Sequence, residues 1–110
     1  MKIAVTAMGM NLYANLDSRF GRAQYILVLD PDGSVIEVID NAASRAAMGG
    51  AGIQAAKMVA DRNVDVLLTG RCGPNAEAAL KAAGIKIGEV QAGTVREVLE
   101  RFNRGDIALT

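Results

Sequence analysis

Residues with a positive charge or a soft sulfur atom gather in three segments of this 110-residue chain, residues 8–24, 41–52 and 70–75. The positive residues are Arg19, Arg22, Arg45 and Arg71, and the one acid among them is Asp17. The sulfur-bearing residues are Met8, Met10, Met48 and Cys72. Arginine attracts anions, while thioether and thiolate sulfur suit soft metal ions such as Cu(I). These residue types therefore indicate a binding site rather than a structural loop.

Glycine is concentrated in the same segments. The stretch NAASRAAMGGAGIQAAKM, residues 41–58, runs from small residues into a helical pattern, and GRCGPN, residues 70–75, precedes another. Glycine lets a ligand approach the backbone, and a helix N-terminus offers free N–H groups and a positive dipole end. The residues expected to bind a ligand are Met8, Met10, Arg19, Arg22, Met48, Gly49, Gly50, Ala51, Gly52, Arg71, Cys72, Gly73 and Asn75. The alternative is that the glycines only shape turns and the arginines only solvate them.

Apolar runs predict the strands that position these segments. Residues 2–7 (KIAVTA) predict a strand buried on both faces. Residues 25–29 and 35–39 flank the turn sequence DPDG, residues 30–33, and this pattern predicts a hairpin. Residues 64–68 and 85–87 predict two further strands, the last of them at an edge of the sheet.

Helical spacing predicts three helices. The first begins near Gly52 and ends at Asn63, a residue that suits a left-handed cap. The second begins at Pro74, runs to residue 83 and is closed by Gly84. Thr94 and Glu97 have the spacing of a capping box ahead of the third.

The order of these elements predicts the fold class. A hairpin followed by crossover helices implies a mixed five-stranded sheet with one antiparallel strand and helices on both faces. We expect a single three-layer α/β domain over residues 1–110, because that length leaves no room for a second domain. In such sheets ligands bind at the carboxyl ends of the parallel strands, where the three segments would meet.

Composition excludes several classes of function. Acidic and basic residues balance at 12 each, so nothing favours binding to a nucleic-acid backbone. The apolar start of the chain is too short for a signal peptide or a membrane span, and no membrane partner is expected. A single cysteine, Cys72, allows no internal disulfide and suits a reducing compartment. We therefore expect a cytoplasmic protein.

Residues for catalysis or for ordinary metal binding are scarce. There is no histidine and one cysteine, which excludes a closed zinc site or a four-cysteine iron-sulfur site within one chain. No histidine can activate Ser18, Ser44 or Cys72, and the carboxylates are too dispersed to gather magnesium. We expect no catalytic residue and no direct metal ligand, so the sulfurs are expected to fill gaps in the packing. The alternative is that they are soft metal ligands.

Nucleotide motifs are weak. Gly50-x-Gly52-x-x-Ala55 matches a relaxed dinucleotide fingerprint, but that motif belongs in the first strand-to-helix turn. No phosphate-binding P-loop sequence is present. A nucleotide-binding switch is therefore a minor alternative, which would predict thermal stabilisation by a nucleotide.

Three segments together resemble a known family. Residues 18–23 (SRFGRA) resemble its HFGRA segment, Asn41 with residues 49–52 resembles its NPA…HGGAG segment, and residues 73–76 resemble its GPNA segment. The family is that of dinitrogenase iron-molybdenum cofactor biosynthesis, and the resemblance spans nearly the whole chain. It implies a ribonuclease H-like fold without the nuclease carboxylates, and a role in binding or carrying metal-sulfur clusters.

Two positions depart from the family pattern. Arg19 stands where HFGRA has histidine, and Met48 stands where HGGAG does. These departures resemble the orange-protein branch of the family, which implies an anionic molybdenum-copper sulfide cluster held largely without protein–metal bonds. We expect a non-catalytic binding or carrier protein for such a cluster. The alternatives are a carrier of an iron-molybdenum-sulfur cluster precursor, and an adaptor that docks on a MinD-like ATPase, the partner that the resemblance suggests.

Overall fold

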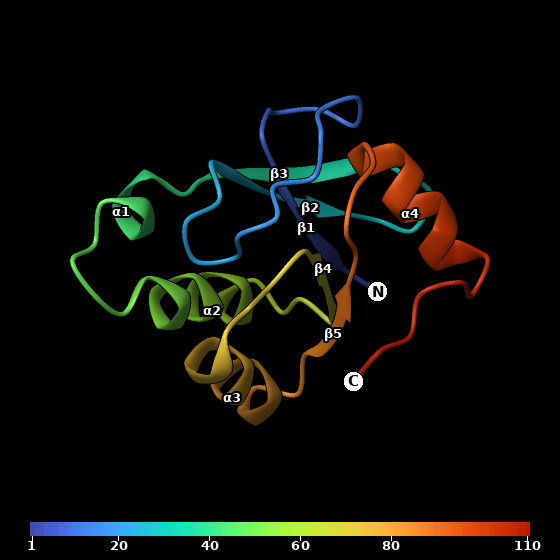
Figure 1. Cartoon of the computed structure of the whole chain (residues 1–110). Coiled ribbons are helices and arrows are strands. Elements are labelled where there is room, and N and C mark those ends of the chain that lie inside the picture. Colours follow the sequence, from blue (N-terminus) through green and yellow to red (C-terminus); the bar gives the residue numbers. More distant parts are fainter.

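A five-stranded mixed sheet forms the centre of the molecule in the computed structural model, which describes all residues 1–110 (Figure 1). The strands are β1 (Ile3–Ala7), β2 (Tyr25–Leu29), β3 (Val35–Asp40), β4 (Val66–Thr69) and β5 (Lys86–Glu89). Their order is β3-β2-β1-β4-β5. β1 pairs antiparallel with β2 and parallel with β4, and β5 is parallel to β4, so β2 alone runs against the other strands. The predicted sheet is confirmed.

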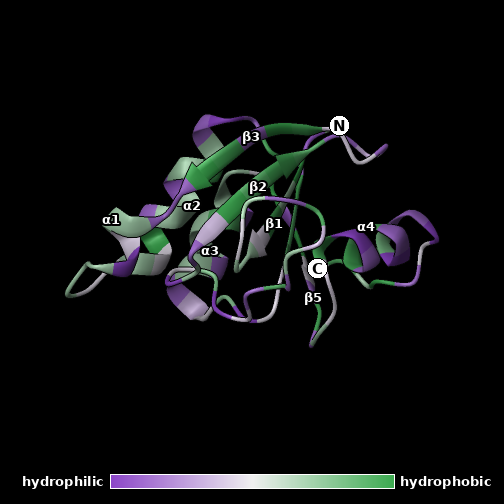
Figure 2. Ribbon diagram, turned by 90° about the horizontal axis from the view of Figure 1, so that it is seen from above, coloured by the Kyte–Doolittle hydropathy of each residue, from purple (hydrophilic) through white to green (hydrophobic).

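Helices cover both faces of this sheet. They are α1 (Ala42–Arg45), α2 (Ala51–Asp61), α3 (Pro74–Ala82) and α4 (Val95–Asn103). Figure 2 shows α4 apart from α1, α2 and α3. One buried cluster joins α2 and α3 to the sheet, and another joins α4 to the opposite face, so the predicted three-layer α/β arrangement is confirmed. The strand order is compatible with the expected ribonuclease H-like label.

The ends of the helices follow local chemistry. Thr94 Oγ1 accepts from the Glu97 backbone N–H, and the Glu97 carboxylate accepts from the Thr94 N–H, which is the predicted capping box. Asn63 has φ 58° and Gly84 has φ 78°, the left-handed conformations expected after α2 and α3. No helix of this chain has the length and apolar character that a membrane crossing requires.

Two features at the ends of elements were not predicted. The four-residue helix α1 lies inside a segment expected to be a loop, and Asp40 Oδ1 accepts from the Ala42 N–H at its start. Strand β5 does lie at the edge of the sheet, but the C-terminal residues cover it, because Ile87 and Thr110 exchange two backbone hydrogen bonds. Elsewhere the predicted bounds of strands and helices differ from the observed bounds by at most two residues, and those of β2 coincide with them.

Candidate functional site: a basic groove at the carboxyl ends of β1 and β4

The segment after β1 lies against the segment after β4. Phe20 is buried in the core, and its N–H donates to the Arg71 carbonyl at 3.0 Å. Arg19 and Arg71 form an isolated parallel bridge at the same place. The two arginines are thus neighbours although they lie 52 positions apart in the sequence. The carboxyl ends of two adjacent parallel strands impose this proximity, as the sequence predicted.

The carboxylate of Asp17 fixes the backbone of residues 17–24 by hydrogen bonds. The residue is 2% exposed, and its carboxylate accepts from the backbone N–H groups of Arg19 and Gln24, each at 3.1 Å. The same carboxylate accepts from Arg19 Nε at 3.3 Å. Asn41 adds a second anchor, because its Nδ2 donates to the carbonyls of Gly21 and Ala23. The backbone that carries Arg19 and Arg22 is therefore fixed by buried polar groups.

Three glycines allow the segments around the site to touch. A Cβ atom on Gly21 would stand 2.6 Å from the Gly52 nitrogen, and one on Gly70 would stand 2.5 Å from Ser18. A Cβ atom on Gly52 would stand 2.8 Å from the Cβ of Ala76 in α3. These glycines serve contacts between chain segments. By contrast, Gly49, Gly50 and Gly73 have nothing within 4 Å of such an atom.

Three adjoining cavities form one depression, which we call the basic groove. The central cavity is about 290 Å³ and is lined by Arg19, Phe20, Gly21, Arg22, Ala51, Gly52, Arg71, Cys72 and Gly73. On the α3 side lies a cavity of about 220 Å³, lined by residues 50–53 and 72–76. On the α1 side lies one of about 360 Å³, lined by Arg19, Arg22, Ala42, Arg45 and Ala46. The neighbouring cavities share lining residues, and no acidic residue lines any of them.

Backbone donors face the same region. The N–H groups of Ala51, Gly52 and Ile53 at the start of α2 have no protein acceptor, and neither do those of Asn75 and Ala76 at the start of α3. No side chain caps either helix. Free N–H groups and the positive ends of two helix dipoles therefore add to the arginine charge, and together they favour an anion.

The arginines of the groove differ in their partners. Arg22 Nη1 donates to the Arg45 carbonyl at the end of α1, at 2.7 Å. Arg19 pairs with Asp17, whereas Arg71 and Arg45 make no ion pair. Most of the positive charge of the groove is therefore uncompensated within the protein.

Cys72 is the one sulfur that lines the groove. It is half-buried and packs against the core beside α2 and α3. Burial raises the pKa of its thiol to about 12, with smaller contributions from the carboxylates of Glu89 and Glu77. Cys72 is therefore a neutral thiol at neutral pH. No group of three or more His, Cys, Asp or Glu side chains lies close enough together to hold a metal ion.

The structure brings most of the predicted site residues together. Seven line the central cavity, namely Arg19, Arg22, Ala51, Gly52, Arg71, Cys72 and Gly73. Gly50 and Asn75 line the adjoining one. Met8, Met10, Met48 and Gly49 line none of the three cavities, and the side chain of Met48 is fully exposed.

Sequence reasoning did not single out every lining residue. Phe20 and Gly21 belong to the groove, and the SRFGRA segment in which they lie was the available signal. Arg45 was noted for its charge but was not assigned to the site. Ala42 and Ala46 lie there because α1 forms, and nothing in their residue type indicated it.

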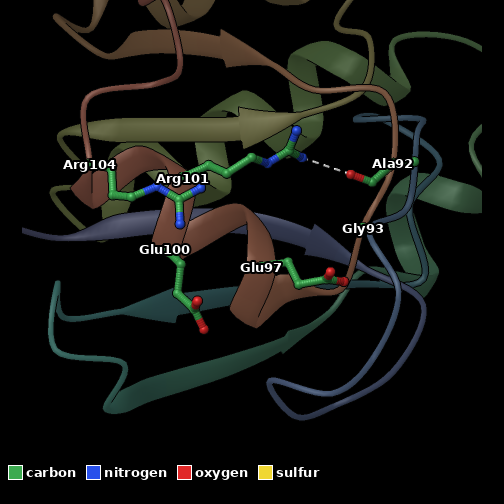
Figure 3. A pocket seen from close by; sticks show the side chains of 6 residues that line it. All are labelled: Ala92, Gly93, Glu97, Glu100, Arg101 and Arg104. Atoms are coloured by element: carbon green, nitrogen blue, oxygen red, sulfur yellow. Dashed lines mark hydrogen bonds between the residues drawn. The ribbon is translucent and has the colours of Figure 1, made fainter.

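A larger cavity of about 410 Å³ lies elsewhere, between α4 and residues 92–93 (Figure 3). Its charged side chains are engaged locally. Arg101 Nη2 donates to the Ala92 carbonyl, Glu97 closes the capping box, and Arg104 pairs with Asp106. Figure 3 shows that these side chains do not converge on one point. We therefore place the candidate site at the basic groove.

Comparison with known proteins shows the family of this chain. Residues 1–105 match the sequence model of the family described as "Dinitrogenase iron-molybdenum cofactor". The chain belongs to this family. The resemblance seen in the three sequence segments is thereby confirmed.

Solved structures of family-like proteins share the fold. The apo form of the orange protein from Desulfovibrio gigas is 45% identical to this chain and has a TM-score of 0.94. The match covers 99% of this chain and 92% of the orange-protein chain. A putative NifB protein from Thermotoga is 31% identical, with 98% and 91% covered and a TM-score of 0.84. Among sequence relatives, an uncharacterized protein from Methanocaldococcus jannaschii is 26% identical over 95 residues, 84% of this chain and 80% of that protein.

Membership of the dinitrogenase iron-molybdenum cofactor family points to a role in binding or carrying a metal cluster. The similar proteins suggest a carrier rather than an enzyme. They give no support to the expected MinD-like ATPase partner.

Proposed function

We propose that this protein binds and carries an anionic molybdenum-copper sulfide cluster in the basic groove, with no turnover of its own. The observation that carries the proposal is that positive charge and free backbone donors converge on one depression. Unpaired arginine charge and acceptor-free N–H groups from two helix N-termini line one depression that contains no acidic residue.

Hydrogen bonds can supply the affinity without a protein–metal bond. Bonds to ionised acceptors contribute ~1.5–3 kcal/mol each, so several N–H and guanidinium donors suffice for stable binding. The cluster sulfides would be the acceptors. Arg19, Arg22 and Arg71 are the charged donors. The backbone N–H groups of Ala51, Gly52 and Asn75 are the uncharged donors, and Gly50 and Gly73 line the cavities beside them.

The groove also offers soft, uncharged contacts. Phe20, Ala51 and the neutral thiol of Cys72 line the central cavity. Burial raises the pKa of this thiol to about 12, so at neutral pH it offers an uncharged contact in the absence of a metal. In the proposed complex the metals would be held within their own sulfide shell. Met48 and Gly49 stand on the segment beside the groove and would contact the cluster only if that segment closed over it.

Family membership supports a cluster as cargo, and the 45% identity to the orange protein supports the molybdenum-copper type that the sequence segments suggested. An iron-molybdenum-sulfur precursor is the alternative cargo, since it too is anionic and the family description names that cofactor. Arginine and methionine at positions 19 and 48 disfavour it, because neither supplies the imidazole nitrogen that a histidine there would.

The test is reconstitution of the apo-protein with tetrathiomolybdate and copper, followed by gel filtration, visible absorption and elemental analysis. We expect charge-transfer bands and co-eluting molybdenum and copper. Arg71→Gln and Arg19→Gln should each weaken retention at least tenfold, because each removes a charged donor contribution of ~1.5–3 kcal/mol.

Arg96→Gln is the matched control, because Arg96 lies on α4 and pairs with the exposed Glu100, outside the groove. It should retain the cluster as the wild type does. Equal weakening of retention in all three variants would show that net charge and not the groove holds the metal, and wild-type retention in all three would contradict the roles of Arg19 and Arg71. A colourless, metal-free protein would overturn the proposal, and the same experiment with an iron-molybdenum-sulfur precursor would then test the alternative cargo.

A further inference from the structure

The segment that carries Met8 and Met10 turns to the α4 side of the sheet, away from the basic groove. We call residues 8–15 the methionine loop. Figure 1 shows this loop beside the start of α4, while residues 17–24 pass on the side of α2. Hydrogen bonds set this course, because the Leu16 N–H donates to the Gly93 carbonyl and the Val95 N–H donates to the Ala14 carbonyl.

Two backbone hydrogen bonds order the methionine loop, one across its ends and one in a turn within it. The Met8 N–H donates to the Asn15 carbonyl at 2.9 Å, and the Ala14 N–H donates to the Asn11 carbonyl at 3.1 Å. A Cβ atom on Gly9 would stand 3.0 Å from the Cβ of Ala14, so a small residue between the two methionines keeps the loop tight. Met8 and Met10 are therefore held on one short, ordered turn.

Packing does not account for these two side chains. Met8 is 50% exposed and Met10 is 61% exposed, whereas Met58, on α2, is partly buried against the core. Methionine is commonly a filler of core gaps, and an exposed pair has no gap to fill. The two Cα atoms, two residues apart, are at most about 7 Å from each other. Side chains with three rotatable bonds can bring their thioether sulfurs to one point from that separation.

The methionine loop and the basic groove differ in their charge. Residues 8–15 (MGMNLYAN) carry no charged side chain, whereas the groove presents arginines and two positive helix ends. A free cation is repelled by the groove and not by the loop. Neutral thioethers have little affinity for hard cations such as Mg²⁺ and select soft ions, above all Cu(I).

We propose that Met8 and Met10 form a separate binding site for a soft monovalent cation, Cu(I), on the methionine loop. The site does not rest on the proposed cluster in the groove. Two thioethers leave coordination positions of the ion open, so an exchangeable site is expected rather than a buried permanent one.

The experiment is an anaerobic titration of the apo-protein with Ag(I), and then with Cu(I) against a competing chelator, followed by NMR of labelled methionine methyl groups. The methyl resonances of Met8 and Met10 should shift together and saturate at one ion per chain. The methyl resonance of Met58, which is partly buried against the core on α2, is an internal reference that should not move.

Met8→Leu and Met10→Leu should each weaken binding at least tenfold, because leucine keeps the volume and removes the sulfur. Met48→Leu is the matched control, since Met48 is also exposed but has no second methionine beside it in the sequence, and it should change the affinity less than twofold. Wild-type affinity in either single loop variant would overturn the proposal. So would a titration that shifts all exposed methionines alike or perturbs only Cys72.

A second readout keeps this inference distinct from the proposed function. The double variant Met8→Leu/Met10→Leu should still retain a preformed molybdenum-copper sulfide cluster in the groove. Loss of Ag(I) binding with cluster retention intact supports two independent sites. Loss of both would show that the loop belongs to the cluster site, which would contradict the separate site proposed here.

Discussion

Gly21 lies so close to Gly52 that a Cβ atom at position 21 would stand 2.6 Å from the Gly52 backbone nitrogen. This contact joins the segment after β1 to the first turn of α2, and it brings Arg19 and Arg22 beside the free N–H groups of that turn. The shape of the groove therefore depends on the absence of a side chain at one position.

Gly21→Ala should destabilise the protein by about 1–3 kcal/mol, because the added methyl group meets backbone atoms that cannot rotate away. Urea denaturation measures the change in the free energy of unfolding. Gly49→Ala is the control, since a Cβ atom there meets nothing within 4 Å, and its effect should stay below about 0.5 kcal/mol. Equal effects in the two variants would contradict the packing role of Gly21.

Asp17→Asn should destabilise the protein by about 1–3 kcal/mol, because an amide cannot accept from both the Arg19 and the Gln24 N–H groups and one buried donor is left without a partner. The same charge change at Asp61, which is exposed and paired with Lys57 in α2, should matter by less than about 0.5 kcal/mol. Chemical denaturation of both variants checks the difference, and a similar small effect at both sites would rule out the anchoring role.

Cys72 should be unreactive toward alkylation at about pH 8, at least tenfold slower in the folded protein than in urea, because burial raises the pKa of its thiol. Iodoacetamide labelling followed by mass spectrometry measures this ratio. The folded-state pKa, about 12, lies above the ordinary 9.0, so this thiol's contribution to stability is fully present below pH 9.0 and is lost as the pH rises toward 12. Fast labelling at neutral pH would show a thiolate and reopen metal ligation by Cys72.

Thr94→Ala should lower the free energy of unfolding by about 1 kcal/mol, because α4 then has no side-chain cap. Calorimetry or urea denaturation measures this change. Thr110→Ala is the control, because the Thr110 hydroxyl makes one long bond of 3.4 Å at the C-terminus and should contribute little. A small effect at both positions would show that packing of the apolar face of α4 alone holds the helix.

Glu97→Ala should show a stability difference from the wild type that depends on pH. Hydrogen bonds from Thr94 lower the pKa of the Glu97 carboxyl below its ordinary 4.5. Because the folded-state pKa is depressed, the contribution is present above 4.5 and is lost as the pH falls through the folded-state value. Thermal unfolding at neutral and at acid pH checks this, and a difference that does not shrink in acid would contradict the capping role of the carboxylate.

The local elements could be predicted because their signals are local. Turn residues between two apolar runs, a proline at a helix start and a threonine three residues before a glutamate each act within one turn of backbone. The helix α1 was missed because four residues cannot show a helical period. Its start depends on Asp40 at the end of an edge strand, which the residue pattern alone did not reveal.

The sequence by itself determined the charge of the three segments and the glycine-rich starts of their helices. It also determined that the segments meet, because the loops at the carboxyl ends of parallel strands lie at one edge of the sheet. The strand order and the pairing of Arg19 with Arg71 came from the structure. Only the tertiary structure decided which residues of those segments line the groove and which of them make other contacts. Hydrogen bonds to residues 93–95 turn Met8 and Met10 away from the groove. Likewise Gly21 and Gly52 serve chain contacts while Gly49 faces open space, because the room beside a glycine depends on distances between segments that lie far apart in sequence.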